Sequence, residues 1–255
     1  MGFTAAAEKY DRFMGRYTTS LAPAFADAAE IAPGMAVLDV GCGPGGLTAE
    51  LAARVGEERV AAIDPAPQFV AACRDRHPGA DVRQGGAEAL PWPDDTFDAA
   101  VCSLVIAFMA DPQRGVSEMA RVTRPGGVVC ACMWDIAGGG MTMLSTFWEA
   151  AREIDSTVAG ERARPGVTEG DLGKRLRAAR LDSVVEGAVE ARVTYTDFFA
   201  FWEPFTFGVG PAGEYLVSLP DEHQARVREA CRKRLPDGQF TLAARAWYAR
   251  GTVPS

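Results

Sequence analysis

The sequence predicts an α/β fold built on a mostly parallel sheet, and two observations carry this prediction. Between residues 34 and 134, short runs that suit buried strands alternate with segments that have the pattern of helices. Parallel strands require such crossover connections, which are usually helical. A glycine-rich turn, Gly41-Cys42-Gly43-Pro44-Gly45-Gly46, follows the first strand and precedes a helix. In open sheets of this kind, ligands bind at the carboxyl ends of the strands, where this turn lies.

The elements can be placed along the chain in order. Residues 1–33 have helical periodicity that Pro33-Gly34 ends, and they predict an N-terminal helical cap. The core then opens with a strand over Val37–Val40. Asp111-Pro112 supplies a capping carboxylate and a first-turn proline to a later helix. Helices of this part are predicted over 45–55, 66–76 and 112–123.

The second half of the chain breaks this alternation at Gly138-Gly139-Gly140. Residues 197–236 are too long for a hairpin connection and rich in aromatic residues, so they predict an inserted lid. We expect a single domain, 1–255, with its core in 34–196 and 237–255. Helices are predicted over 141–157 and 169–179, and strands near 183–195 and 239–248.

Composition limits the partners. The net charge of −8 at pH 7 argues against a nucleic-acid backbone, because counterion release requires a cationic surface. No apolar run approaches the roughly 20 residues that span a bilayer, and the first residues lack a secretory pattern. We therefore expect a cytoplasmic protein without a membrane partner, and the composition leaves a homodimer open.

Cysteine and histidine give no sign of a metal site. The six cysteines lack paired zinc-site spacing and are expected to be buried free thiols. The two histidines, His77 and His223, are expected at exposed ends of helices. We therefore expect no metal.

The glycine turn and the acid before it indicate which ligand binds. Gly41 and Gly43 permit restricted backbone angles and let a ligand touch the main chain. A pyrophosphate would gain from the amides at the following helix N-terminus, but Asp39 would repel it. A cationic nucleoside suits that carboxylate better. S-adenosylmethionine (SAM), with its sulfonium and ammonium groups, is such a ligand.

A second acid has the spacing of a ribose ligand. Residues 60–63 predict a strand that ends in Asp64, 23 residues after Gly41. Nucleotide-binding sheets place an acid at about this distance to bind the ribose hydroxyls. Alternatively, Asp64 caps the helix that starts near Pro65-Ala66.

Further motifs follow in order as far as Trp134, at residues 85–91, 98–103 and 123–128. With the glycine turn, they resemble the class I SAM-dependent methyltransferases of the UbiE-like, small-molecule group. The resemblance implies a Rossmann-like fold with a seven-stranded sheet, whose last strand is antiparallel and inserted beside the sixth. It implies SAM as cofactor but does not name the methyl acceptor. The matching segments are an adenine-side loop at 85–91, a fourth strand at 98–103, and a turn at 123–128 before the fifth strand.

The resemblance also implies roles at the methionine end of SAM. The turn Gly41-Cys42-Gly43 is expected along the methionine portion, with the backbone of Ser103 nearby. Asp39 either accepts amide hydrogen bonds from this turn or meets the SAM ammonium, directly or through water. Arg16 is a candidate for binding the SAM carboxylate, or else a surface arginine.

On the adenine side, Ala87 is expected to donate its backbone amide, and Pro65 is counted among the cofactor-binding residues. Many relatives carry an acid immediately before this alanine, whereas this chain has Gly86. Glu88 or a water replaces that acid, or the pocket is looser; Glu88 can also be a solvated loop acid. Phe69 is expected in the core rather than on adenine.

For the acceptor we predict a pocket formed by Tyr17, Phe108, Trp134 and Trp202. The aromatic residues of the expected lid favour a small hydrophobic or aromatic acceptor beneath them. Those aromatic residues could instead pack on the sheet edge or meet a partner chain. They are Phe198, Phe199, Phe201, Trp202, Phe205 and Phe207.

Methyl transfer from a sulfonium is an in-line displacement that alignment and desolvation can drive without a metal. We assign no catalytic base; Tyr17, Asp135 and Glu203 are the remaining candidates. A SAM-binding cyclase or a non-catalytic SAM-binding module on the same fold is the alternative function. An NAD-dependent oxidoreductase is a further alternative, against which the later motifs count.

Overall fold

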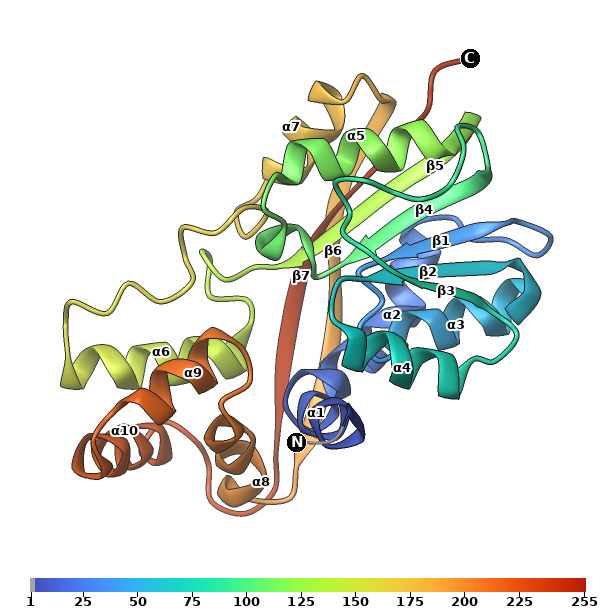
Figure 1. The fold of residues 1–255 in the computed structure, drawn as a ribbon. Helices are drawn as coiled ribbons and strands as arrows, with labels where there is room; N and C mark the ends of the chain where they lie inside the picture. Colours follow the sequence, from blue (N-terminus) through green and yellow to red (C-terminus); the bar gives the residue numbers. More distant parts are fainter. Residues whose placement is uncertain (1–2) are drawn as a thin grey trace.

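The computed structural model describes residues 3–255, so Met1 and Gly2 of the expected cap lie outside the described residues. Its strands form one sheet of seven in the order β3-β2-β1-β4-β5-β7-β6 (Figure 1). Strands β1 to β5 pair in parallel, whereas β7 pairs antiparallel with both β5 and β6. This confirms the predicted fold class. The strands are β1 Val37–Val40, β2 Val60–Asp64, β3 Asp81–Gln84, β4 Phe97–Ser103, β5 Thr123–Trp134, β6 Asp182–Tyr195 and β7 Phe240–Thr252.

Helices cover both faces of the sheet. Helices α2, α3 and α4 lie on one face and α5 and α7 on the other, while α6, α8, α9 and α10 gather beyond one end of the long β6–β7 pair (Figure 1). The predicted elements are present, with ends shifted by a few residues. The helices are α1 Phe3–Tyr10, α2 Arg16–Ala28, α3 Gly46–Val55, α4 Pro67–Arg76, α5 Pro112–Val122, α6 Thr142–Ile154, α7 Asp171–Ala178, α8 Phe198–Trp202, α9 Gly210–Ser218 and α10 Asp221–Arg232, with short helical turns at Asp11–Gly15, Glu57–Arg59, Ile106–Phe108 and Glu203–Phe207.

The central strands carry two acids into the interior. Every residue of β1 and β2 is buried, as expected for parallel strands that helices cover on both faces. Asp39 and Asp64 are 1% and 7% exposed. They lie in neighbouring strands near the carboxyl ends, so the fold places both acids close to one edge of the sheet.

The predicted turn over 123–128 is instead part of a strand. Strand β5 begins at Thr123, and its register with β4 jumps, because Phe97 pairs with Thr123 but Ala99 pairs with Val128. The extra residues form a bulge in which Gly126 has φ +75°. The residues that predict a turn therefore form a bulge at the start of β5.

Three aromatic residues of segment 197–236 pack in the core, namely Phe201, Trp202 and Phe205, whereas Phe199 is 59% exposed. Phe205 stacks on Phe147 of α6, with 4.6 Å between ring centroids. Phe201 is fully buried, and Trp202 is 6% exposed and stacks on Phe198. Contacts with α6 and with the ends of β6 and β7 therefore account for the buried aromatic residues of this segment.

One histidine differs from expectation. His77 is 8% exposed rather than at an exposed helix end. Its Nε2 lies 3.2 Å from the carbonyl of Gly45 and its Nδ1 lies 3.4 Å from Glu57, because α4 ends against the glycine turn. The six cysteines are buried free thiols, as predicted.

Two absences hold for residues 3–255. No group of three or more His, Cys, Asp or Glu side chains in this range could hold a metal ion. Nor does any helix of this range combine the length and the apolar character that crossing a membrane requires.

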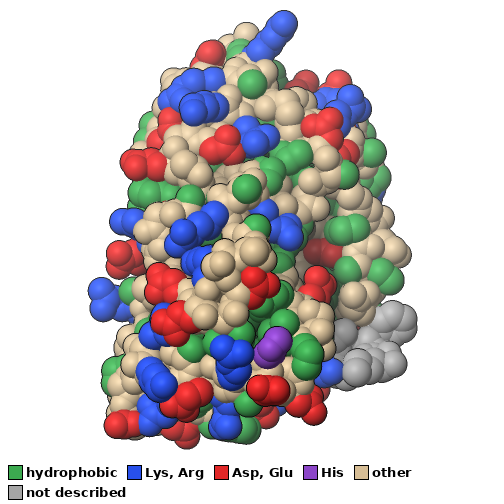
Figure 2. Space-filling view, turned by 90° about the vertical axis from the view of Figure 1, so that its left-hand side faces the viewer, with side chains coloured by type: hydrophobic (Ala, Val, Ile, Leu, Met, Phe, Trp, Pro, Cys, Tyr) green, Lys and Arg blue, Asp and Glu red, His purple; other side chains and the backbone are tan. Residues whose placement is uncertain are grey.

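The surface near α10 mixes both signs of charge. Figure 2 shows the face that carries α6 and α10, where Lys and Arg side chains are interleaved with Asp and Glu. At the end of α10, Arg232 pairs with Asp237, and just beyond the helix Arg234 pairs with Glu153 of α6 at 2.5 Å. This face therefore gives no support to a nucleic-acid backbone as partner.

Candidate active site

A cavity of about 580 Å³ lies at the carboxyl ends of β1, β2, β4 and β5. Ligand sites in proteins have volumes of roughly 300–1,000 Å³. Eight of the fourteen predicted site residues line this cavity, so the structure brings these eight together. They are Gly41, Gly43, Asp64, Pro65, Ala87, Glu88, Phe108 and Trp134.

The glycine turn forms part of the cavity wall. The amides of Gly41 and Cys42 donate to the carbonyl of Ile63 at 2.7 and 3.0 Å, which fixes the turn to the end of β2. Gly41 and Gly43 have φ of +77° and +53°. A Cβ on Gly41 would come within 2.4 Å of Val105, whereas a Cβ on Gly43 would meet nothing within 4 Å. Gly41 is therefore required by packing, and Gly43 leaves its backbone open to a ligand.

Asp64 links the turn to the next helix. Its Oδ2 accepts from the amide of Gly43 and its Oδ1 from the amide of Ala66, each at 2.9 Å. Ala66 immediately precedes α4, so the helix-capping alternative describes part of the role. Burial raises the pKa of Asp64, and the two amide hydrogen bonds oppose that rise. Each carboxylate oxygen retains a lone pair, so Asp64 can also bind hydroxyls in the cavity.

Asp39 lies behind the turn rather than on the cavity surface. Its Oδ2 accepts from the hydroxyl of Thr48 at 2.7 Å, and not from the turn amides. Its Oδ1 is buried and has no hydrogen-bond partner among the described residues. Burial raises the pKa of Asp39 to about 7, against the hydrogen bond from Thr48. An unpaired carboxylate oxygen at this depth fits a cationic ligand group or a water that reaches one.

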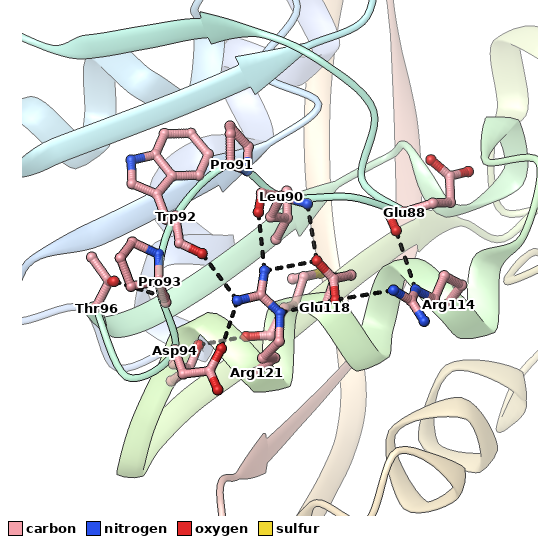
Figure 3. A network of polar contacts seen from close by, with 12 residues as sticks. Glu88, Leu90, Pro91, Trp92, Pro93, Asp94, Thr96, Arg114, Glu118 and Arg121 are labelled. Atoms are coloured by element: carbon pink, nitrogen blue, oxygen red, sulfur yellow. Dashed lines mark hydrogen bonds and ion pairs between the residues drawn. The ribbon is translucent and has the colours of Figure 1, made fainter.

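A polar network fixes the loop that contains residues 85–94, part of which is expected to lie beside adenine (Figure 3). The guanidinium of Arg121 donates to the carbonyls of Leu90 and Trp92 at 3.0 Å and to Asp94 at 2.7 Å. Glu118 accepts from the amide of Leu90 at 3.0 Å and pairs with Arg121 at 2.8 Å. The Arg121 guanidinium holds the pKa of Glu118 below its usual value. Through these contacts α5 holds the loop that supplies Ala87.

Glu88 has a structural task in this loop. Its Oε1 accepts from the amides of Ala110 and Asp111, at 2.8 and 3.3 Å, where α5 begins. The carboxylate thus joins two stretches of the cavity wall rather than pointing freely into solvent. A Cβ on Gly86 would lie 2.9 Å from Glu88, so this acid occupies space that a side chain at position 86 would need.

Two residues expected near methionine lie beside the cavity without lining it. Cys42 is buried under the turn, in an apolar cluster that includes Cys73. The hydroxyl of Ser103 lies 3.5 Å from the Sγ of Cys132, while the next residue, Leu104, lines the cavity. The chain direction at the end of β4 therefore places Leu104, not Ser103, on the wall.

Arg16, Tyr17 and Trp202 do not line the cavity either. The guanidinium of Arg16 lies over the ring of Tyr195, 5.1 Å from its centroid. The Tyr17 hydroxyl is hydrogen-bonded to the Tyr195 hydroxyl at 2.8 Å in the core. Trp202 packs among aromatic residues, which corrects its expected place in the acceptor roof. Segment 197–236 instead reaches the cavity through residues 209–212.

The other candidate bases have structural partners. Asp135 is 1% exposed, pairs with Arg245 and accepts from the amide of Gly138 at 2.9 Å. Glu203 pairs with Arg12. Like Tyr17, neither acid lines the cavity.

Sequence reasoning missed several parts of the wall. Phe69, expected in the core, lines the cavity and contacts Tyr10 edge to face at 5.2 Å. Tyr10 belongs to a stretch of mixed aromatic and cationic residues, and this composition is the feature of the sequence that could have indicated a contribution to the site. Glu161 lies in a polar loop whose sequence is typical of a solvent-exposed segment. Nothing in the local sequence therefore indicates that Glu161 lines a cavity. Other lining residues that were not predicted include Phe13, Met14, Met109, Met133, Ile136, Leu144 and residues 209–212.

Known proteins are similar to this chain in sequence and in fold. A family model described as a methyltransferase domain matches residues 38–131. The rice 2-methyl-6-phytyl-1,4-hydroquinone methyltransferase 2 is 42% identical over 37% of this chain and 28% of its own length. The [4+2]-cyclase SpnF has a TM-score of 0.59 at 21% identity, covering 93% of this chain and 82% of the cyclase, a likeness in fold.

The chain covers 28% to 45% of the length of several curated relatives that it matches in part. An uncharacterised methyltransferase of Mycobacterium sp. strain JLS is similar over far more of both chains. It is 33% identical over 224 residues, which are 81% of this chain and 84% of the relative. The chain therefore belongs to the class I SAM-dependent methyltransferases of UbiE-like type.

Proposed function

We propose that this protein transfers the methyl group of SAM to a small acceptor with a hydrophobic or aromatic body. One observation carries the proposal, namely a single cavity with two unlike parts. The first, called the cofactor part, comprises the glycine turn, Asp64 and residues 85–88. The second, called the acceptor part, is lined mainly by apolar side chains such as Phe108, Trp134 and Leu144.

The cofactor part fits SAM, which when bound supplies a methyl group activated by a sulfonium cation. Asp64 can accept from the ribose hydroxyls while it holds the turn, and such a bond to a carboxylate contributes about 1.5–3 kcal/mol. The open backbone at Gly43 allows close approach of the cofactor. The unpaired Oδ1 of Asp39 provides negative charge behind the turn, where a cationic group would relieve its isolation.

The acceptor part supports transfer by alignment. Apolar walls exclude water from the reacting atoms, and alignment alone can contribute roughly 7–11 kcal/mol to lowering the barrier. None of the three candidate bases lines the cavity, so we derive no proton transfer from them.

The acceptor class follows from the lining. The rice relative is named for a phytyl hydroquinone, an aromatic ring with an apolar tail. A comparable aromatic body would suit the apolar lining of this cavity. Residues 1–33 and 197–236 contribute Phe13, Met14 and residues 209–212 to that lining, so we propose that they act as cap and lid.

Titration calorimetry with SAM, S-adenosylhomocysteine and NAD tests the cofactor. We expect binding of the first two and none of NAD; the reverse pattern would overturn the proposal. Methyl transfer from labelled SAM to a panel of phenols, hydroquinones and aromatic amines then tests the reaction. Binding of SAM without transfer to any member would favour a cyclase or a non-catalytic module.

A further inference from the structure

An acid lies within the acceptor part of the cavity. Glu161 belongs to the loop between α6 and α7, is 3% exposed and lines the cavity. The indole Nε1 of Trp148 donates to its Oε1 at 3.1 Å. Its second oxygen accepts no hydrogen bond from the described residues. The other lining carboxylates, Asp64 and Glu88, hold backbone amides of the cofactor part.

The surroundings of Glu161 leave its charge poorly compensated. Burial raises the pKa of Glu161, and the Trp148 hydrogen bond and the charge of Arg164 oppose the rise. Arg164 makes no ion pair with it; its guanidinium lies over the ring of Phe108, 5.1 Å from the centroid, and donates to the carbonyl of Ala107 at 3.3 Å. A buried carboxylate with one open oxygen is costly unless a ligand supplies a donor.

We propose that Glu161 binds the methyl acceptor by accepting a hydrogen bond from its hydroxyl or N–H group. This inference rests on the proposed function and sharpens it. The acceptor is an apolar, aromatic-sized molecule that carries a hydrogen-bond donor on the side facing the α6–α7 loop. Glu161 is thereby a specificity-determining residue, because an analogue without the donor leaves the carboxylate buried and unpaired.

The Trp148 contact makes a sharp test possible. In Glu161→Gln the side chain keeps its shape, and the amide oxygen must turn toward Trp148 to accept its N–H. The amide NH2 then replaces the open oxygen. The variant therefore presents a donor where the wild type presents an acceptor, and the preference for ligands should change in direction.

The probes are 2-naphthol, which carries a donor, and 2-methoxynaphthalene, which does not. Their dissociation constants are measured by calorimetry with and without saturating S-adenosylhomocysteine. The wild-type protein should bind 2-naphthol with a dissociation constant at least about tenfold lower than that of the ether. A ratio of this size corresponds to one hydrogen bond to a charged group. In Glu161→Gln that gap should close to within about twofold or reverse. Glu169→Gln, on the exposed part of the same loop, should keep the wild-type gap.

Two results would overturn the inference: wild-type protein that fails to prefer 2-naphthol, or a Glu161→Gln variant that retains the full gap. A matching unfolding temperature confirms that the variant is folded. Failure of the proposed function would appear separately, as absent binding of S-adenosylhomocysteine. The comparison of the two probes without the cofactor would still test the role of Glu161.

Discussion

The two parts of the cavity are built in different ways. The cofactor part is made by short turns at strand ends, and hydrogen bonds such as those of Asp64 with Gly43 and Ala66 fix its backbone. The acceptor part is assembled from segments far apart in the chain, including Phe13, Glu161 and residues 209–212. Its contacts are mainly apolar packing.

The sheet therefore fixes the positions of the residues in the cofactor part, whereas the residues of the acceptor part are less constrained by the fold. Sheet geometry leaves the glycine turn and Asp64 little choice of position, because β1 and β2 pair in register up to Ile63. No comparable constraint holds the acceptor part, whose residues depend on how the added helices pack. Binding of SAM should therefore resist changes in the acceptor part, whereas acceptor choice should not.

The largest expected effect tests whether the aromatic residues of segment 197–236 stabilise the hydrophobic core. Trp202→Ala should lower the free energy of unfolding by about 3–5 kcal/mol, because it removes a buried aromatic side chain. The SAM affinity of the folded variant should stay within about 1 kcal/mol, since Trp202 does not line the cavity. Denaturant unfolding and calorimetry check both values. A stable variant with lost SAM binding would place Trp202 in the site after all.

The second effect concerns the isolated charge in the cofactor part. The folded-state pKa of Asp39, about 7, lies above the unfolded value of 3.8, so the native state holds the proton more tightly. Stability is therefore lost as pH rises between about 4 and 7, by on the order of 3–4 kcal/mol. Asp39→Asn should remove this component, so its stability relative to wild type should grow over that range. Denaturant unfolding of both proteins at several pH values measures this difference. A difference in unfolding free energy that stays constant with pH would contradict the raised pKa of Asp39.

The third effect probes the backbone of the glycine turn. Gly43→Val should weaken SAM binding by about a hundredfold, because a branched side chain would enter the open space at a left-handed φ. Gly34→Val is the matched control, since Gly34 has φ +91°, equally open surroundings and an exposed position. Both variants carry backbone strain, and Gly43→Val alone should lose SAM. Equal affinities would remove the turn from the cofactor site.

The smallest effect belongs to the acceptor part. Phe108 is 56% exposed and lines the cavity, so Phe108→Ala should change stability by no more than about 0.5 kcal/mol. Binding of 2-naphthol should fall about tenfold through lost apolar contact, with SAM affinity unchanged. Calorimetry with each ligand measures both. A larger loss for SAM than for 2-naphthol would break the division between the two parts.

The same division explains how much the sequence could predict. The turn at Gly41 and the acid at Asp64 were predictable, because their spacing is set by strand and helix lengths in one continuous stretch. Glu161 was not, since a lone acid in a polar loop resembles a solvated one until tertiary packing buries it beside Trp148. His77 was placed wrongly for the same reason: a helix end appears exposed unless the glycine turn that covers it is known.

A crystal structure of the complex with S-adenosylhomocysteine tests the central claim most directly. We predict that the ribose hydroxyls lie within hydrogen-bonding distance of Asp64, with adenine beside Ala87 and the sulfur facing the acceptor part. The side chains of Phe108, Trp134 and Glu161 should remain free of the cofactor. Adenosine bound against Leu144 and Glu161, or outside this cavity, would contradict the division of the cavity into cofactor and acceptor parts.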